Sequence, residues 1–251
     1  MKRPTHRGFT LVELLATIAI IGVLSGILIA GIGKARDRAK ASQCLNNLRQ
    51  VTLAMIAYTG ENKGKLPAQQ TTVNGQPLTW RAQLLPYLGD NKSMEVFLCP
   101  ADGIGRESIS APYDLKYIAD TGVMPASYGP AVVWYYLSSS TLPYPGGYTG
   151  DYRLNTITTP AKTLFLTDIG RPENISLPPD QWTEGNRSPR TQSAESVMPS
   201  VYYANAWTAY PRHGGDKVNS AFFDGHAAVV SIQELRANTP GNPNCLYWPY
   251  R

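Results

Sequence analysis

The longest run of hydrophobic residues lies near the amino terminus, from Phe9 to Ile32. These 24 residues include one charge, Glu13, and three other clearly polar side chains, Thr10, Thr17 and Ser25. As an α-helix the segment would be about 36 Å long, which is enough to cross a hydrocarbon layer of ~30 Å. The pattern therefore predicts a transmembrane helix.

A short basic segment, residues 1–8, precedes this apolar run. A secretory signal peptide also has a basic start and an apolar middle, and such a peptide would be cleaved after a small residue, here near Ala30. Two features favour a retained helix instead. The apolar run is longer than the core of a typical signal peptide, and it continues without a turn-rich break into a second helical pattern.

In that second pattern the positions that would share one helix face recur at intervals of four and three residues: Ala41, Leu45, Leu48, Thr52 and Met55. This spacing is typical of an amphipathic helix that lays one face on a core. We therefore predict one continuous helix over about residues 9–59, roughly 75 Å long, with Gly60 as its carboxyl-terminal cap.

The remainder of the chain predicts a mixture of short helices and strands. A helix is expected over 79–88, capped by Thr79 and limited by Pro86. Aromatic and β-branched residues predict strands at 131–137 and 162–168. Residues 218–223 and 226–232 flank an Asp-Gly pair, which favours the turn of a β-hairpin.

The predicted fold class is therefore α+β. A long amino-terminal helix, transmembrane in its first half, would pack on the antiparallel β-sheet of a head.

The distribution of charge argues against a nucleic-acid-binding protein. The chain has a net charge of +5, with 23 basic and 18 acidic residues. Eight of the basic residues and two of the acidic ones lie in residues 1–50, so the remaining 201 residues carry 15 basic and 16 acidic side chains. This nearly neutral body lacks the basic stripe that phosphate contacts require.

Residues 7–15 read RGFTLVELL, and this segment resembles the class III signal of type IV pilins and type II secretion pseudopilins. The resemblance implies cleavage between Gly8 and Phe9 by a prepilin peptidase, N-methylation of Phe9 and a mature chain of 243 residues. It also implies a pilin-like fold with four parts: a leader at 1–8, a transmembrane assembly helix at 9–32, its amphipathic continuation at 33–60 and a β-rich head at 61–251.

Glu13 then acquires a physical role, because a carboxylate inside a bilayer costs at least ~2.5 kcal/mol. In the family that the segment resembles, this acid is thought to face the amino group of the neighbouring subunit's first residue. Such pairing would neutralise two buried charges and favour assembly. The alternative is a glutamate close enough to the headgroups to reach water.

The carboxyl-terminal part carries a second resemblance, to pseudopilin-like proteins of the PulG type. Arg212-His213 and the later Asp224-Gly225 resemble the H-x9-DG-type region of those proteins, although ten residues separate His213 from Asp224 here. The segments LNNLRQ at 45–50 and CPAD at 99–102 also resemble recurring segments of that group.

Four side chains near predicted strand or hairpin ends could converge as a structural or metal-binding cluster: Asp168, His213, Asp224 and His226. The alternative is that a histidine and an acid only tie a loop to the sheet. Ca²⁺ is a second option for a metal, since some pseudopilins bind it, but the sequence has no EF-hand-like run of acids. No cofactor is otherwise expected. The sequence also lacks a nucleophile elbow, a phosphate-binding loop and a zincin motif, so we do not expect an enzyme.

Three cysteines are present: Cys44, Cys99 and Cys245. In an oxidising compartment a disulfide between Cys44 and Cys99 would fasten the helix to the head, and a free buried Cys44 is the alternative.

Together these features predict a structural subunit of a type II secretion pseudopilus or a type IV pilus-like filament. The resemblance implies a single-pass protein of the inner membrane, with its head in the periplasm or outside the cell. The implied partners are prepilin peptidase, copies of the same chain, other pseudopilins, the inner-membrane assembly platform and the lipid bilayer. The alternative is a monomeric, membrane-anchored envelope protein whose aromatic head binds a ligand or polysaccharide.

Overall fold

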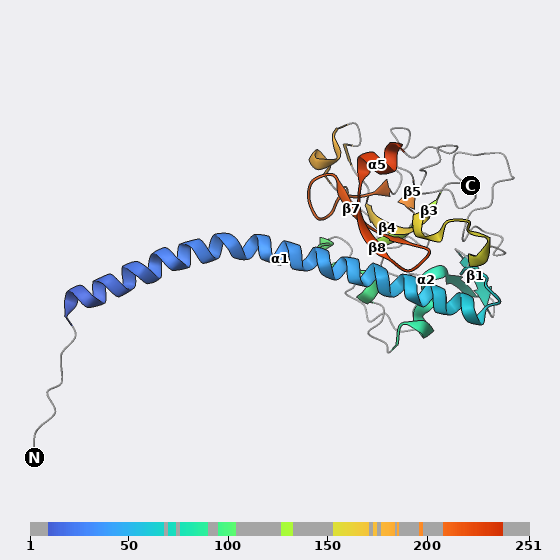
Figure 1. Ribbon diagram of the computed structural model, residues 1–251, viewed down its shortest axis with the longest axis horizontal. Coiled ribbons are helices and arrows are strands. Elements are labelled where there is room, and N and C mark those ends of the chain that lie inside the picture. The colour runs from blue at the N-terminus through green and yellow to red at the C-terminus, as the bar shows by residue number, and fades with distance from the viewer. Residues whose placement is uncertain are drawn as a thin grey trace, which may run out of the picture. The chain divides into compact units, whose positions relative to one another are not determined.

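The computed structural model describes residues 10–67, 70–73, 76–89, 95–103, 127–132, 153–170, 173–174, 177–183, 185, 196–197 and 208–237. The chain divides into two compact units, an amino-terminal unit of residues 1–39 and a carboxyl-terminal unit of residues 40–251. Figure 1 shows the elements of both units along the chain.

The first element is one long helix, α1 (Leu11–Glu61), which forms the described part of the amino-terminal unit and opens the carboxyl-terminal one. The helix predicted over residues 9–59 is therefore confirmed, apart from its ends. Gly60 does not cap it, because the helical hydrogen bonds continue past this residue. The chain leaves the helix at Lys63 and Gly64, both with positive φ, and the Gly64 amide donates to the Thr59 carbonyl as in a Schellman turn.

The carboxyl-terminal unit contains a two-stranded hairpin, a six-stranded sheet and short helices. The bounds of these elements are β1 (Gln70–Val73), β2 (Gln76–Thr79), α2 (Trp80–Leu84), β3 (Tyr128–Val132), β4 (Leu164–Gly170), β5 (Ser196–Val197), β6 (Thr208–Ala209), β7 (Lys217–Phe222), β8 (Ala227–Ser231) and α5 (Ile232–Ala237).

The main sheet is built on four antiparallel strands, paired β3 with β4, β4 with β7 and β7 with β8. The two-residue strands β5 and β6 pair parallel with each other. β5 also pairs parallel with the last residues of β3, and β6 pairs antiparallel with the last residues of β4. A long helix followed by this antiparallel sheet is the α+β fold that the sequence predicts.

Three of the elements predicted from local sequence can be compared with the structure. The predicted helix at 79–88 is α2 followed by a 3-10 turn at Leu85–Tyr87, and the Thr79 side chain caps it by accepting from the Ala82 amide. The strand predicted at 162–168 starts two residues later, because Pro160–Lys162 forms a 3-10 turn. The strand predicted at 131–137 begins earlier, as β3, and residues 133–137 lie outside the described part of the chain.

The predicted hairpin is confirmed as β7 and β8, joined by a turn in which Gly225 has φ of 96°. An L side chain rarely adopts this conformation. A Cβ on Gly225 would also lie 3.1 Å from Cδ1 of Ile56 and 3.3 Å from Cδ2 of Leu53, both on α1. The backbone of the turn therefore favours glycine, and any larger residue would also require these two side chains of α1 to shift.

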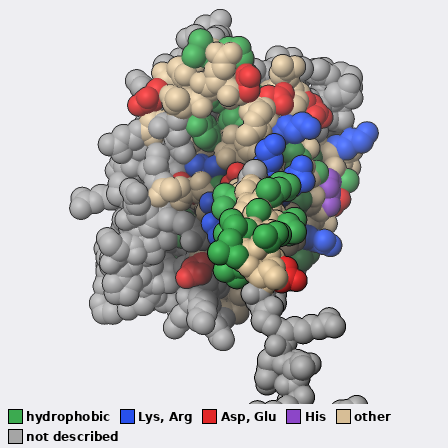
Figure 2. Space-filling model, turned by 90° about the vertical axis from the view of Figure 1, so that its left-hand side faces the viewer, with side chains coloured by type: hydrophobic (Ala, Val, Ile, Leu, Met, Phe, Trp, Pro, Cys, Tyr) green, Lys and Arg blue, Asp and Glu red, His purple; other side chains and the backbone are tan. Residues whose placement is uncertain are grey.

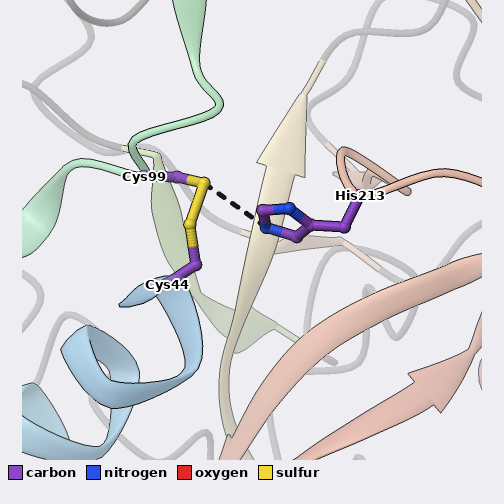
Figure 3. A group of neighbouring side chains, drawn as sticks. All are labelled: Cys44, Cys99 and His213. Atoms are coloured by element: carbon purple, nitrogen blue, oxygen red, sulfur yellow. Dashed lines mark hydrogen bonds between the residues drawn. A yellow bond between two sulfur atoms is a disulfide. The ribbon is translucent and has the colours of Figure 1, made fainter. Parts of the chain in front are cut away.

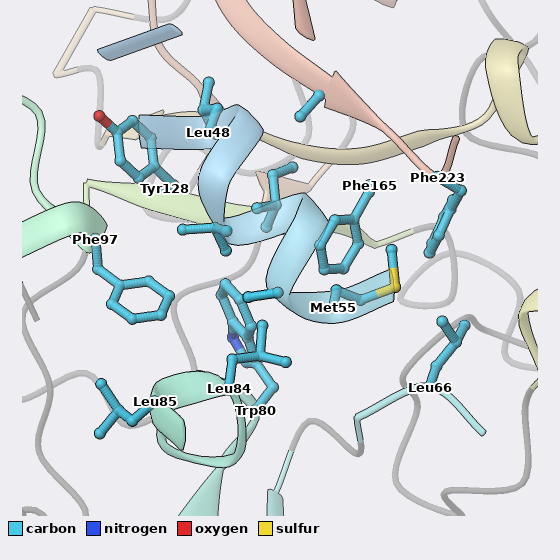
Figure 4. Close-up of a cluster of buried hydrophobic side chains, with 14 of the residues drawn as sticks. Leu48, Met55, Leu66, Trp80, Leu84, Leu85, Phe97, Tyr128, Phe165 and Phe223 are labelled. Carbon is cyan, nitrogen blue, oxygen red and sulfur yellow. The ribbon is translucent and has the colours of Figure 1, made fainter. Parts of the chain in front are cut away.

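The core of the carboxyl-terminal unit lies between the second half of α1 and the sheet (Figure 4). The buried residues of α1 recur at the spacing of one helix face: Cys44, Leu48, Val51 and Met55. They pack with aromatic side chains from five other segments, including Trp80, whose ring meets Phe97 and Phe165 edge to face. A second apolar cluster joins Val218 and Phe222 of β7 to Leu235 of α5.

Replacing Leu48 with alanine is expected to lower the free energy of unfolding of this unit by about 3 kcal/mol, because Leu48 is fully buried and its removal leaves a cavity. Leu53→Ala on the same helix is the matched control, since Leu53 is 50% exposed and should cost less than about 1 kcal/mol. Urea unfolding of the detergent-solubilised chain, followed by tryptophan fluorescence, measures both. Equal losses would contradict this placement of the core.

Candidate functional site

The apolar half of α1 presents its side chains outward. Every described large hydrophobic residue from Leu11 to Ile32 is at least 45% exposed, and these side chains are among those coloured green in Figure 2. By length and composition this helix could cross a membrane. Exposed apolar area of this kind is unfavourable in water and requires a cover of lipid or protein.

Of the residues predicted for processing and assembly, Gly8 and Phe9 lie outside the described residues. Glu13 lies in the first turn of α1 and turns back toward the start of the helix. Its Oε2 atom accepts hydrogen bonds from the Thr10 amide at 2.9 Å and the Thr10 hydroxyl at 2.8 Å, and the Glu13 amide lies 3.3 Å from that hydroxyl. This is a capping box, so within one chain the carboxylate already contacts polar donors.

In the carboxyl-terminal unit, side chains with chemically active groups gather around Cys99 (Figure 3). Cys99 forms a disulfide with Cys44 of α1, and both residues are fully buried. The Nε2 atom of His213, in the loop before β7, lies 3.4 Å from the Cys99 sulfur. The disulfide thus joins the helix to the 95–103 segment, and the histidine contacts it from the sheet side.

A buried polar network continues from this histidine. His213 Nε2 lies 3.7 Å from Oδ2 of Asp168 on β4, and the Asn219 amide of β7 donates to the same oxygen at 3.0 Å. The guanidinium of Arg212 lies 3.4 Å from the Asp102 carboxylate and donates to the Ile169 carbonyl. Asp102 also accepts from the hydroxyl of Ser127. These contacts fix the 99–102 segment and the 210–216 loop against β4.

The three segments that resemble pseudopilins of the PulG type meet at this place. CPAD supplies Cys99 and Asp102, and the Arg212-His213 pair contacts both. The LNNLRQ segment supplies Asn47, whose side-chain amide donates to the Leu98 carbonyl at 3.1 Å while buried in the core. Sequence reasoning missed this convergence, although the resemblance had marked all three segments.

The four side chains Asp168, His213, Asp224 and His226, which could have formed one cluster, do not converge. They form two pairs instead: His213 with Asp168, and His226 with Asp224, whose Nδ1 and Oδ1 atoms lie 2.6 Å apart in the half-exposed hairpin turn. The pairs lie at opposite ends of β7, a six-residue strand about 20 Å long at ~3.3 Å per residue. The length of this strand is the physical reason that one metal cannot join them.

The surroundings of His213 favour its neutral form. Burial, followed by the positive charge of Arg212, lowers the pKa of His213 from 6.5 to about 4. At neutral pH the imidazole is therefore uncharged, and its contact with Asp168 is not an ion pair.

This low pKa predicts a loss of stability in acid. Between pH 6.5 and about 4 the unfolded chain binds a proton at His213 that the folded chain does not, so the free energy of unfolding falls as the pH falls through this window. His213→Gln should flatten this part of the stability profile, while His226→Gln should leave it in place. Urea midpoints measured from pH 7.5 to 4 test the expectation, and a profile unchanged by His213→Gln would contradict it.

Comparison with known proteins adds two family matches. Residues 33–175 match a family described as protein of unknown function (DUF1559), and residues 3–29 match the prokaryotic N-terminal methylation motif. No solved structure matches the chain significantly.

Three curated relatives match parts of the chain. The type IV major pilin protein PilA of Myxococcus xanthus is 40% identical over 58 residues, which are 23% of this chain and 26% of the relative. The type II secretion system core protein G of Pseudomonas aeruginosa is 26% identical over 32% of this chain and 62% of the relative. The core protein G of Escherichia coli is 27% identical over 47% of this chain and 85% of the relative. The chain thus spans about a quarter of the pilin and about three fifths of the first core protein G.

Proposed function

The chain belongs to the family described as protein of unknown function (DUF1559). Within this family, we propose that it is a structural subunit of a type II secretion pseudopilus or a type IV pilus-like filament. The observation that carries the proposal is the exposed apolar half of α1, whose start matches the N-terminal methylation motif. The partial similarity to a type IV major pilin and to two type II secretion core proteins G supports it.

The proposed processing removes residues 1–8 and methylates the new amino terminus at Phe9. The apolar segment 9–32 then anchors the subunit in the inner membrane as a single span, and the amphipathic segment 33–60 leads to the head, 61–251, on the periplasmic or outer side. Prepilin peptidase, the inner-membrane assembly platform, other pseudopilins and copies of the same chain are the proposed partners.

In the assembled filament, helices of neighbouring subunits would replace lipid around the exposed apolar side chains of α1. Glu13 would determine how far neighbouring helices are shifted along one another. In the single chain its carboxylate is held by Thr10. In the filament we propose that it accepts from the methylated amino group of a neighbouring subunit, which neutralises two charges that the membrane interior disfavours. The proposed role is structural rather than catalytic.

Intact-mass analysis of the protein purified from its own host tests the processing. The expected species begins at Phe9, contains 243 residues and carries one added methyl group. A species that retains residues 1–8, or one trimmed after the apolar run near Ala30, would contradict the proposal.

Crosslinking in native membranes tests the assembly. We expect a ladder of oligomers from the wild-type chain and its loss in Glu13→Gln, because the amide cannot neutralise an ammonium group. Asp37→Asn, an acidic position farther along the same helix, is the control and should keep the ladder. Monomer alone in every variant would instead support the membrane-anchored envelope protein.

A further inference from the structure

The two sulfurs of the disulfide and one histidine nitrogen form a compact group of donor atoms. The Sγ atoms of Cys44 and Cys99 and a ring nitrogen of His213 all lie within 4.8 Å of one another, and this is the one such group among the described residues. The residues come from α1, the 95–103 segment and the loop before β7, and both cysteines are fully buried. Figure 3 shows the histidine ring pointing at the Cys99 sulfur.

The distances in this group are close to those of a tetrahedral metal site. In such a site with Zn–S of ~2.3 Å and Zn–N of ~2.0 Å, the sulfur and nitrogen ligands are about 3.5 Å apart and two sulfurs about 3.8 Å apart. The observed separation of His213 Nε2 from the Cys99 sulfur is 3.4 Å. The Cys44 sulfur lies within 4.8 Å of the same nitrogen, and the two bonded sulfurs must separate before both can bind one ion.

We propose that the chain, when these two cysteines are reduced, binds one Zn²⁺ ion through Cys44, Cys99 and His213. A dithiol reductant supplies two electrons and two protons that convert the disulfide into two thiols, and the reductant becomes a disulfide. Zn²⁺ then replaces both thiol protons, which leave to solvent, and the thiolates neutralise the charge of the ion. Two thiolates and one imidazole are a donor set that zinc favours.

The fourth position of this site has a neighbour of suitable chemistry. Oδ2 of Asp168 lies 3.7 Å from His213 Nε2 and is oriented by the Asn219 amide, so a carboxylate stands beside the imidazole ligand. Asp168 is therefore placed to stabilise the bound cation by its negative charge. The site and the disulfide exclude each other, because the same two sulfurs serve both.

The proposal rests on the carboxyl-terminal unit and is independent of filament assembly. Cobalt(II) is the probe, since it takes the place of zinc in tetrahedral sites and absorbs strongly when bound to thiolates. Cys245→Ser is the background, so that Cys44 and Cys99 are the chain's two remaining thiols. The full-length chain is prepared in detergent in two forms, reduced under a phosphine and oxidised.

The reduced chain is expected to bind one cobalt per chain with sulfur-to-cobalt charge-transfer absorption, and the oxidised chain none. Zinc should displace the cobalt. His213→Ala should weaken binding at least 100-fold and Asp168→Asn about 10–100-fold, as is typical of supporting groups. His226→Ala, the other imidazole at the far end of β7, should change it less than twofold.

Circular dichroism and tryptophan fluorescence separate binding from folding. A reduced chain that is folded and binds cobalt, or that folds only when cobalt is added, supports the proposal. A reduced chain that is folded without binding, that stays unfolded with metal present, or that binds equally well as His213→Ala overturns it.

Discussion

Replacing both Cys44 and Cys99 with alanine is expected to lower the free energy of unfolding of the carboxyl-terminal unit by about 4 kcal/mol. The bond closes a loop between residues 55 positions apart, and the loop-entropy relation assigns about 4 kcal/mol to a loop of this size. The loop runs from α1, through the β1–β2 hairpin and α2, to the 95–103 segment. Chemical unfolding of the oxidised chain and of the double variant, in the same detergent, gives the difference.

Both chains carry Cys245→Ser, so that they differ only at Cys44 and Cys99. A loss below about 1 kcal/mol in the double variant would contradict the prediction, because it would mean that the cross-link constrains the unfolded chain little.

Replacing Asp102 with asparagine is expected to cost about 3–5 kcal/mol. Both members of the Asp102–Arg212 pair are buried, with side chains 0% and 3% exposed, and their charged groups lie 3.4 Å apart. The amide keeps the shape of the carboxylate but removes its charge, so the buried guanidinium loses the negative charge that the carboxylate supplies. Calorimetry or urea unfolding at pH 7 measures the loss.

Asp224→Asn is the matched control for this second prediction. Asp224 also carries an ion pair in the structure, with His226, but both side chains are more than a third exposed. Its Oδ1 atom accepts from the His226 amide, a bond that an asparagine can also make. The expected cost is below about 1 kcal/mol, as for surface pairs in general. A cost for Asp102→Asn no larger than this would show that the buried pair contributes no net compensation.

The elements that the sequence predicted best are those whose causes are local. The periodicity of Leu48 and Met55 predicted one face of α1, and an Asp-Gly pair predicted the β7–β8 turn. Thr79 predicted the start of α2, since an N-cap needs only its own side chain and the next turn of backbone. These features depend on residues fewer than about ten positions apart, so the sequence carries them directly.

The end of α1 shows where such local reasoning failed. Gly60 predicted a cap because glycine favours positive φ, yet the chain takes that conformation at Lys63 and Gly64. The Arg153 guanidinium donates to the Lys63 carbonyl, and Lys65 forms a bridge with Arg153. Contacts with a segment 90 residues away thus accompany the turn that ends the helix, and a local rule cannot include them.

The candidate site could be predicted only in pieces, for the same reason. Cys99 and His213 are 114 positions apart, and their contact depends on where the 95–103 segment and the 210–216 loop reach β4. The sequence instead grouped Asp168, His213, Asp224 and His226 because all four lie near predicted strand or hairpin ends. The pattern does not tell at which end of a strand each side chain lies, and an extended strand separates its two ends by several ångströms per residue.

The disulfide occupies a particular place along α1. Proceeding from the start of the helix, Cys44 is the first described residue that is fully buried, ahead of Leu48, Val51 and Met55. A force that pulls on the amino-terminal end of α1 therefore acts on the Cys44–Cys99 disulfide before it can displace the buried apolar side chains farther along this helix. In the oxidised chain, Cys44 joins the helix covalently to the 95–103 segment. In the reduced chain, side-chain packing holds the helix, and such a force could separate the helix from the core one turn at a time.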